Sequence, residues 1–100
     1  MGASAFTALG TGSDIESAFR AAHQQACYDY GHAGYTGTIA EKDSYVQIDD
    51  GRVFTPKDAA ELAQQLIDDD DARIADKHGP AGALKLSEPG SWLFFGWASS

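Results

Sequence analysis

Hydrophobic residues recur every three or four positions in two stretches of the chain, which is the spacing of one face of an α-helix. The first stretch predicts a helix over residues 13–30. Ser13 and Glu16 form an S-x-x-E capping box at its start, and Gly31 is a natural residue to follow its end. Its hydrophobic stripe consists of Ile15, Ala18, Phe19, Ala22, Ala26 and Tyr30.

The second stretch predicts a helix that begins at Pro56, with Thr55 as its N-cap, and ends near Asp69. Four consecutive aspartates at its end oppose the helix dipole, and a short helical piece over residues 71–77 is expected to follow. The stripe of this helix consists of Ala59, Leu62, Ala63, Leu66 and Ile67.

Four other segments are rich in strand-forming residues. Residues 35–40 and 44–49 flank Glu-Lys-Asp and predict an antiparallel hairpin, which an Asp50-Gly51 turn and a short extended piece at 52–54 follow. Residues 82–87 and 91–98 flank Glu-Pro-Gly and predict a second hairpin. The last strand is apolar on both faces, which places it in the centre of the sheet or at an interface.

These elements follow the order α-β-β-α-β-β. They predict an α+β fold in which the two helices pack on one face of a mainly antiparallel sheet. Residues 1–12 are expected to be a flexible N-terminal segment, and residues 13–100 a single domain.

Composition restricts the partners that the chain can have. Seven basic and 15 acidic residues give a net charge of −8. This charge argues against binding to nucleic acid or to anionic membranes, and favours a protein with a basic groove as partner. One cysteine excludes an internal disulfide, and with no signal peptide at the start a cytoplasmic location is expected.

A loop rich in glycine and tyrosine follows the first predicted helix. Aromatic rings around a glycine loop can stack on a ring-shaped ligand such as a nucleotide, although the glycine spacing does not match a dinucleotide fingerprint. The alternative is a loop that merely turns the chain and lets the tyrosines pack. The ligand-binding candidates are Tyr30, His32, Gly34, Tyr35, Thr36, Lys42 and Arg52.

Two further features are candidates for binding a partner protein. The acidic run at residues 68–71 could occupy a basic groove, although such runs are usually only solvated. The closing segment SWLFFGWASS holds more aromatic residues than so small a core can bury, and self-association into a homodimer is the simplest use of the excess. The partner-binding candidates are Asp68, Asp69, Asp70, Asp71, Trp92, Phe94 and Trp97.

Candidate catalytic chemistry is limited to one pair. His23 and Cys27 are four residues apart on the first helix, so their side chains can meet, as a nucleophile and its base must. The pair lacks an evident third group and a helix N-terminus to activate the thiol, so we expect no catalytic residue. The histidines and the cysteine also lack the paired spacing of a zinc site, and no metal or cofactor is expected.

The segment YDYGHAGYTGTIAEKD, the later HGPAG and the closing FFGWAS resemble small uncharacterised proteins of actinobacterial phages and related mobile elements. This resemblance covers residues 13–48 and about the last 24. It implies an accessory protein that acts on a host protein, in the host cytoplasm, often by binding and inhibiting it. It carries no catalytic residues over.

The sequence therefore predicts a small, acidic, non-enzymatic interaction protein that inhibits a host protein, one of the host's defence proteins for example. The alternative is a protein that binds or sequesters a small, nucleotide-like ligand in the loop after the first helix.

Overall fold

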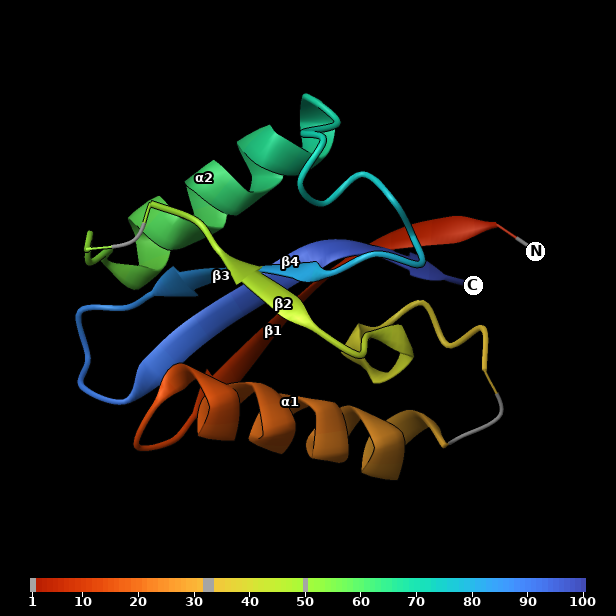
Figure 1. Cartoon of the computed structure of the whole chain (residues 1–100), viewed down its shortest axis with the longest axis horizontal. Coiled ribbons are helices and arrows are strands. Elements are labelled where there is room, and N and C mark those ends of the chain that lie inside the picture. Colours follow the sequence, from red (N-terminus) through yellow and green to blue (C-terminus); the bar gives the residue numbers. More distant parts are fainter. Residues whose placement is uncertain (1, 32–33, 50) are drawn as a thin grey trace.

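The computed structural model describes residues 2–31, 34–49 and 51–100. In that part, two helices, one short 3-10 helix and a four-stranded sheet form an α+β domain (Figure 1). The elements, in chain order, are β1 (Ala3–Thr11), α1 (Ile15–Tyr30), η1 (Ile39–Glu41), β2 (Tyr45–Gln47), α2 (Pro56–Asp68), β3 (Ala81–Lys85) and β4 (Ser91–Ser99).

The strands lie in the order β1-β4-β3-β2. β4 pairs antiparallel with β1 and with β3, and β2 pairs parallel with β3. The sheet is therefore mixed rather than mainly antiparallel. Parallel neighbours need a crossover connection, and α2 supplies it between β2 and β3. The prediction that the last strand lies in the centre of the sheet is confirmed, as is the hairpin that joins β3 to β4.

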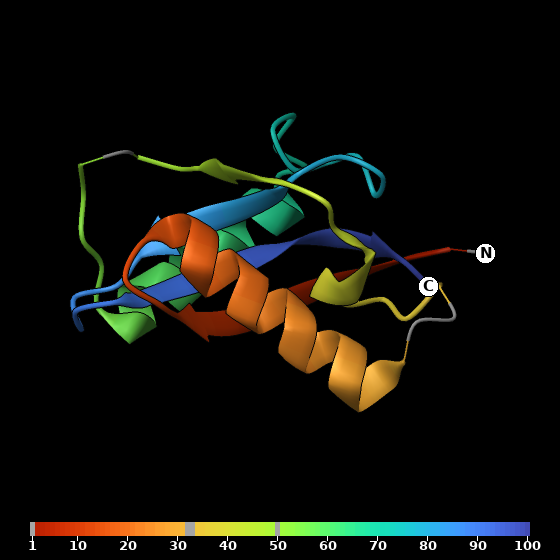
Figure 2. The same cartoon turned by 60° about the horizontal axis from the view of Figure 1, so that its bottom comes forward.

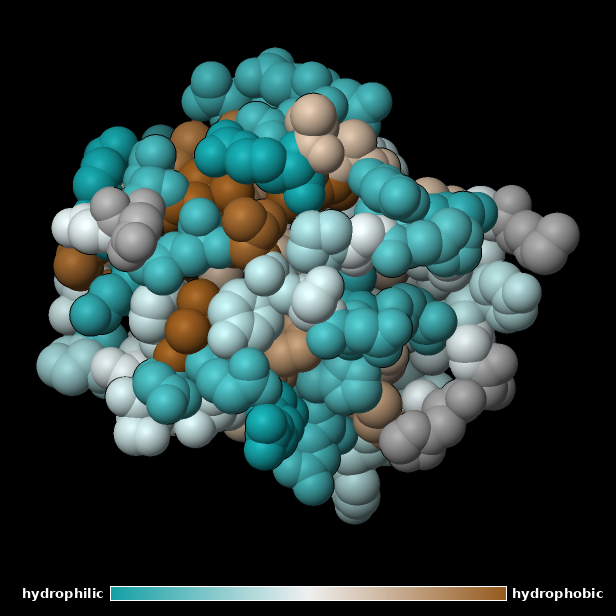
Figure 3. All heavy atoms as spheres, in the orientation of Figure 1, coloured by the Kyte–Doolittle hydropathy of each residue, from teal (hydrophilic) through white to brown (hydrophobic). Residues whose placement is uncertain are grey.

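The expectation that both helices cover one face of the sheet is wrong, because α1 and α2 cover opposite faces (Figure 1). The alternating side chains of β4 explain the arrangement. Phe94 packs with Phe19 of α1, whereas Phe95 belongs to the cluster around Ala63 of α2. A strand that is apolar on both faces needs cover on both, so one helix goes to each side. On the surface seen in Figure 3, hydrophobic side chains show between the mainly hydrophilic ones of α2 and β2.

Residues 1–12 were expected to be flexible, and this is wrong for residues 3–11. They form β1, which pairs with β4 over its whole length, from Ala3 opposite Ser99 to Thr11 opposite Ser91. Only Phe6 and Gly10 of this strand are buried. Most of the strand consists of small residues of modest strand preference, so the hydrophobic pattern does not reveal it.

The predicted hairpin over residues 35–49 is also wrong. Its first half forms a loop and η1, whose residue Ile39 is buried against α1. The Thr38 hydroxyl caps η1 by accepting a hydrogen bond from the Ala40 N–H at 3.2 Å. Only Tyr45–Gln47 becomes a strand, and it pairs with β3 instead of with residues 35–40. The burial of Ile39 has overridden the local strand preference. Asp50 of the expected turn lies outside the described residues.

Both helices lie close to their predicted places. α1 has Asp14 rather than Ser13 as its N-cap, because the Asp14 carboxylate accepts from the Ser17 N–H at 2.8 Å. Tyr30, at the end of its stripe, is exposed. α2 begins with Thr55 as N-cap and Pro56 at its first position, as predicted. Residues 71–77 form turns and not the expected second helical piece.

The first and last strands bring the two ends of the described chain together (Figure 1). The Gly2 N–H donates to the Ser100 carbonyl at 3.0 Å, and the Ser100 N–H donates to the Gly2 carbonyl at 3.1 Å. In the strand order β1-β4-β3-β2, β1 is one edge of the sheet and β2 is the other.

Candidate functional site

The outer edge of β1 carries a row of backbone groups that point away from the sheet. Gly2 and Ser100 exchange both of their backbone hydrogen bonds, and such pairs alternate along an antiparallel ladder. The even-numbered residues of β1 therefore direct their N–H and C=O groups to β4, as the bond from Gly12 to the Gly90 carbonyl also indicates. The backbone groups that face outward belong to Ala3, Ala5, Thr7, Leu9 and Thr11.

No strand in the described part of the chain pairs with this edge. Natural sheets usually protect an exposed edge with charged side chains, proline, a bulge or a very short strand. β1 has nine residues, none of them charged and none of them proline, and its register with β4 is continuous. The edge is chemically open to a further strand.

A groove of about 410 Å³ runs between this edge and α1. Phe6 and Ala8 of β1, Ala22 and Ala26 of α1, and Ile39 of η1 give it apolar walls. In Figure 2, α1 crosses over β1 and its C-terminal half extends past the strand. An added strand would therefore lie beside β1 and under the second half of α1.

The groove carries negative charge at the end that lies beside the C-terminus of α1. Asp29 lies in the last turn of α1, exposed, and accepts a hydrogen bond from the Gln25 side chain at 3.0 Å. The last turn contains no basic residue, so Asp29 adds to the partial negative charge of the helix C-terminus. None of the groove-lining residues that the structure describes is a lysine or an arginine.

The face of β1 that points away from α1 is not covered by α2, which packs over β3 and β4. Leu9 is 69% exposed on this face. Trp97, on the neighbouring strand β4, is half-buried, and its indole Nε1 is buried without a hydrogen-bond partner in the described residues. This face of β1 therefore exposes one large apolar side chain, Leu9, between Thr7 and Thr11.

Lys42 does not offer a positive charge to a ligand, contrary to the prediction. Its side chain is fully buried, and its Nζ donates to the backbone carbonyls of Asp76, Lys77 and Gly79 at 3.3, 3.2 and 3.0 Å. Burial lowers the pKa of the Lys42 ammonium, and the charge of Asp76 opposes this shift. Lys42 therefore holds the loop at residues 76–79 against the domain.

The other ligand-binding candidates do not converge on one pocket. Tyr30 lines the groove beside β1, whereas Tyr35 is 60% exposed in the loop and has a positive φ of 59°. Thr36 is held within the loop, where its hydroxyl donates to the Glu41 carboxylate at 2.8 Å. Arg52 pairs with Asp49 at 3.4 Å and lies over the ring of Phe54. An added side chain at Gly34 would meet only open space, and His32 lies outside the described residues.

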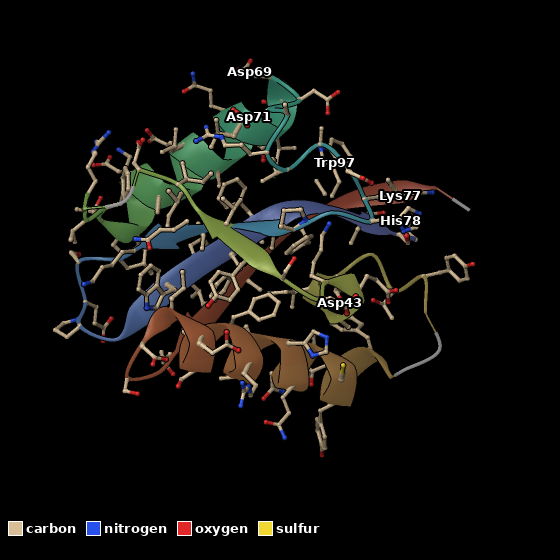
Figure 4. The ribbon with its side chains drawn as sticks, in the orientation of Figure 1. Asp43, Asp69, Asp71, Lys77, His78 and Trp97 are labelled. Carbon is tan, nitrogen blue, oxygen red and sulfur yellow. The ribbon has the colours of Figure 1, made fainter. Side chains whose placement is uncertain are left out.

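The acidic run at residues 68–71 lies at the C-terminal end of α2. Asp68, Asp69 and Asp70 are exposed at the end of α2, and Asp71 pairs with Arg73 at 2.9 Å. In Figure 4, Asp69 and Asp71 lie at that end of the molecule, whereas Asp43 lies beside α1 on the other side of the sheet. Asp43 therefore does not share a face with the acidic run at residues 68–71.

Two of the aromatic partner-binding candidates are part of the core. Phe94 is 0% exposed and Trp92 is 7% exposed, so neither presents a surface to a partner. Only Trp97 is partly accessible. The prediction overestimated the excess of aromatic residues, because a sheet covered on both faces can bury alternate rings of one strand in two separate clusters.

The Cys27 Sγ and the His23 Nδ1 lie 3.8 Å apart, as their spacing predicts. Cys27 is a buried residue of α1, and a buried thiol is poorly placed to attack a substrate. In the described ranges, no group of three or more histidine, cysteine or acidic side chains is placed to hold a metal ion.

No helix in the described part of the chain is long and apolar enough to cross a bilayer. Comparison with protein-family models, with curated proteins and with solved structures found no match to this chain.

The edge of β1 is the feature that sequence reasoning missed. One signal was present: residues 1–13 contain no charged residue, in a chain where 22% of residues are charged. If such a segment forms an edge strand, it lacks the charged side chains and prolines that usually protect an edge from further pairing.

Proposed function

We propose that this chain is a non-enzymatic interaction protein that binds an extended segment of a partner protein as a fifth strand, at the free edge of β1. Strand addition is a common mode of peptide recognition. The backbone hydrogen bonds provide affinity, and pockets for alternate side chains provide specificity.

The observation that carries this proposal is the unprotected edge itself. Five outward-facing residues of β1 leave their backbone groups without a strand partner in the described chain, and apolar side chains form part of the neighbouring groove. A nine-residue uncharged edge strand is a liability in a protein that has no use for it, because it invites uncontrolled pairing.

The proposed consequence for the partner is inhibition. The resemblance to proteins of actinobacterial phages and mobile elements supports a host protein as the target. A segment that is held as a strand in this sheet is withdrawn from its own contacts. The net charge of −8, with Asp68, Asp69 and Asp70 exposed, favours fast association with a basic partner.

Replacing Thr7 with proline tests the proposal. The Thr7 N–H faces outward, so Thr7→Pro removes one donor from the free edge and leaves the hydrogen bonds to β4 in place. Thr7→Val keeps the N–H and is the matched control. Thermal midpoints measured by circular dichroism show whether both variants fold.

The assay is capture of partners from an actinobacterial lysate, followed by amide hydrogen exchange of the complex. We expect Thr7→Val to capture the same partner as the wild type and Thr7→Pro to lose it. In the complex, the outward amides of Ala5, Thr7 and Leu9 should become protected. Strand addition would be refuted if Thr7→Pro still captured the partner. It would also be refuted if the partner protected only amides outside β1.

A further inference from the structure

We propose that the segment bound at the β1 edge carries a lysine or arginine whose side chain binds Asp29 and the C-terminal end of α1, and small apolar side chains at the alternate positions that enter the groove. This inference rests on the proposed function, and it adds the chemistry that the site selects.

The direction of the side chains follows from the strand geometry. Neighbouring strands place their side chains on the same faces in register. Phe6 and Ala8 of β1 point to α1, and both line the groove. The side chains of an added strand that lie level with Phe6 and Ala8 would therefore also point to α1, into the groove.

Part of the wall that these side chains meet is apolar. Ala22 and Ala26 of α1 are buried there, and Ile39, which also lines the groove, is 1% exposed. Alanines leave room for a side chain but give it no polar partner. A small aliphatic residue fits such walls, whereas a buried polar group would lose its hydrogen bonds to water without replacement.

The cation preference follows from the charge at the C-terminal end of α1. Asp29 is in the last turn, where a carboxylate is unfavourable, and the last turn of α1 has no basic residue to offset it. Gln25 contacts Asp29 through a neutral amide at 3.0 Å. A lysine or arginine from the bound segment would satisfy both the carboxylate and the helix dipole. This is the charge complementarity that selects the segment.

Because side chains alternate between the two faces of a strand, the basic residue and the small apolar residue of the bound segment should be two positions apart. Since α1 begins above Gly10 and runs back along β1, Asp29 lies toward the N-terminal half of the strand. The cation belongs at a groove-facing position near Phe6, and the small apolar residue belongs two positions away, near Ala8.

Selection from a random decapeptide display library tests the inference. The wild type and two charge variants serve as bait. Asp29→Lys reverses the charge beside the groove and is compatible with the helix dipole, so it should fold. Glu61→Lys changes the net charge equally on the exposed side of α2 and is the matched control.

We expect the wild type and Glu61→Lys to enrich lysine or arginine at one fixed position, with small apolar residues two positions away. Asp29→Lys should replace that preference with aspartate or glutamate. For one enriched peptide, exchanging its lysine for norleucine should weaken binding by roughly twofold to fivefold, as expected for an exposed ion pair. On Asp29→Lys, the same exchange should instead strengthen binding, because it removes the repulsion between two cations.

The inference would be overturned if the enriched peptides had no fixed basic position. It would also be overturned if the peptides selected by Asp29→Lys kept the same basic position. In both cases strand addition itself would still stand. Peptides that bind Thr7→Pro as well as the wild type would overturn strand addition itself. Sedimentation analysis tests whether the occupant of the edge is a second copy of this chain. A dimeric wild type together with a monomeric Thr7→Pro variant would show this, and would overturn both the binding of a partner segment and the inferred motif.

Discussion

Replacing the buried Lys42 with methionine should destabilise the fold substantially. Methionine keeps most of the aliphatic stem and removes the ammonium group that donates to the carbonyls of Asp76, Lys77 and Gly79. Hydrogen bonds from a charged donor contribute about 1.5–3 kcal/mol each. The loss of three such bonds is offset by several kcal/mol, because the buried charge no longer has to be desolvated.

The net expectation for Lys42→Met is a loss of about 2–4 kcal/mol in the free energy of unfolding, since the carbonyls left behind lose a buried donor. In a domain of this size, that loss lowers the thermal midpoint by roughly 10–25 °C. Urea and thermal denaturation followed by circular dichroism measure both quantities.

Lys57→Met is the matched control, because Lys57 is exposed on α2, and it should change stability by less than about 0.5 kcal/mol. If Lys42→Met is as mild as this control, the ammonium does not hold the 76–79 loop and the reasoning is refuted.

Two further perturbations test other parts of the structure. Gly10→Ala should lower the free energy of unfolding by about 1–3 kcal/mol in urea denaturation, because the added methyl group would collide with the Ala18 carbonyl. Gly2→Ala is the control and should be neutral, because the added methyl group has room there. Equal effects of the two substitutions would contradict the close approach of β1 and α1. Hydrogen bonds from the Arg73 side chain and backbone lower the pKa of Asp71, so its stabilisation is present above about pH 4 and lost as the pH falls through its folded pKa. Acid titration of the thermal midpoint should therefore be shallower for Asp71→Asn than for the wild type or for the exposed Asp69→Asn, and identical curves would exclude a contribution from this pair.

The elements that the sequence predicted well have strong local signals. The apolar stripes of α1 and α2 repeat at helical spacing, and Thr55 with Pro56 is a clear helix start. β4 is a continuous apolar run next to a Glu-Pro-Gly turn, which identified both its hairpin and its central position.

The elements that the sequence did not predict depend on distant contacts. β1 is recognisable only by its pairing with β4, whose paired residues are 80 to 96 positions away along the chain. Lys42 lies in a charged tripeptide that is typical of a turn, and its three carbonyl partners are 34 to 37 residues further on. No local pattern encodes such partners, so the candidate site at the β1 edge was predictable only from its lack of charge.

The pairing of the first strand with the last has a consequence for how this protein is made. A ribosome adds about 5–20 residues per second, so β1 waits for several seconds or more before residues 91–99 are synthesised. During that time both edges of β1 lack a partner, and closing the long loop between the strands is the slow, entropically costly step. The segment that we propose as the binding edge is therefore also exposed to wrong partners on the nascent chain until β4 is made.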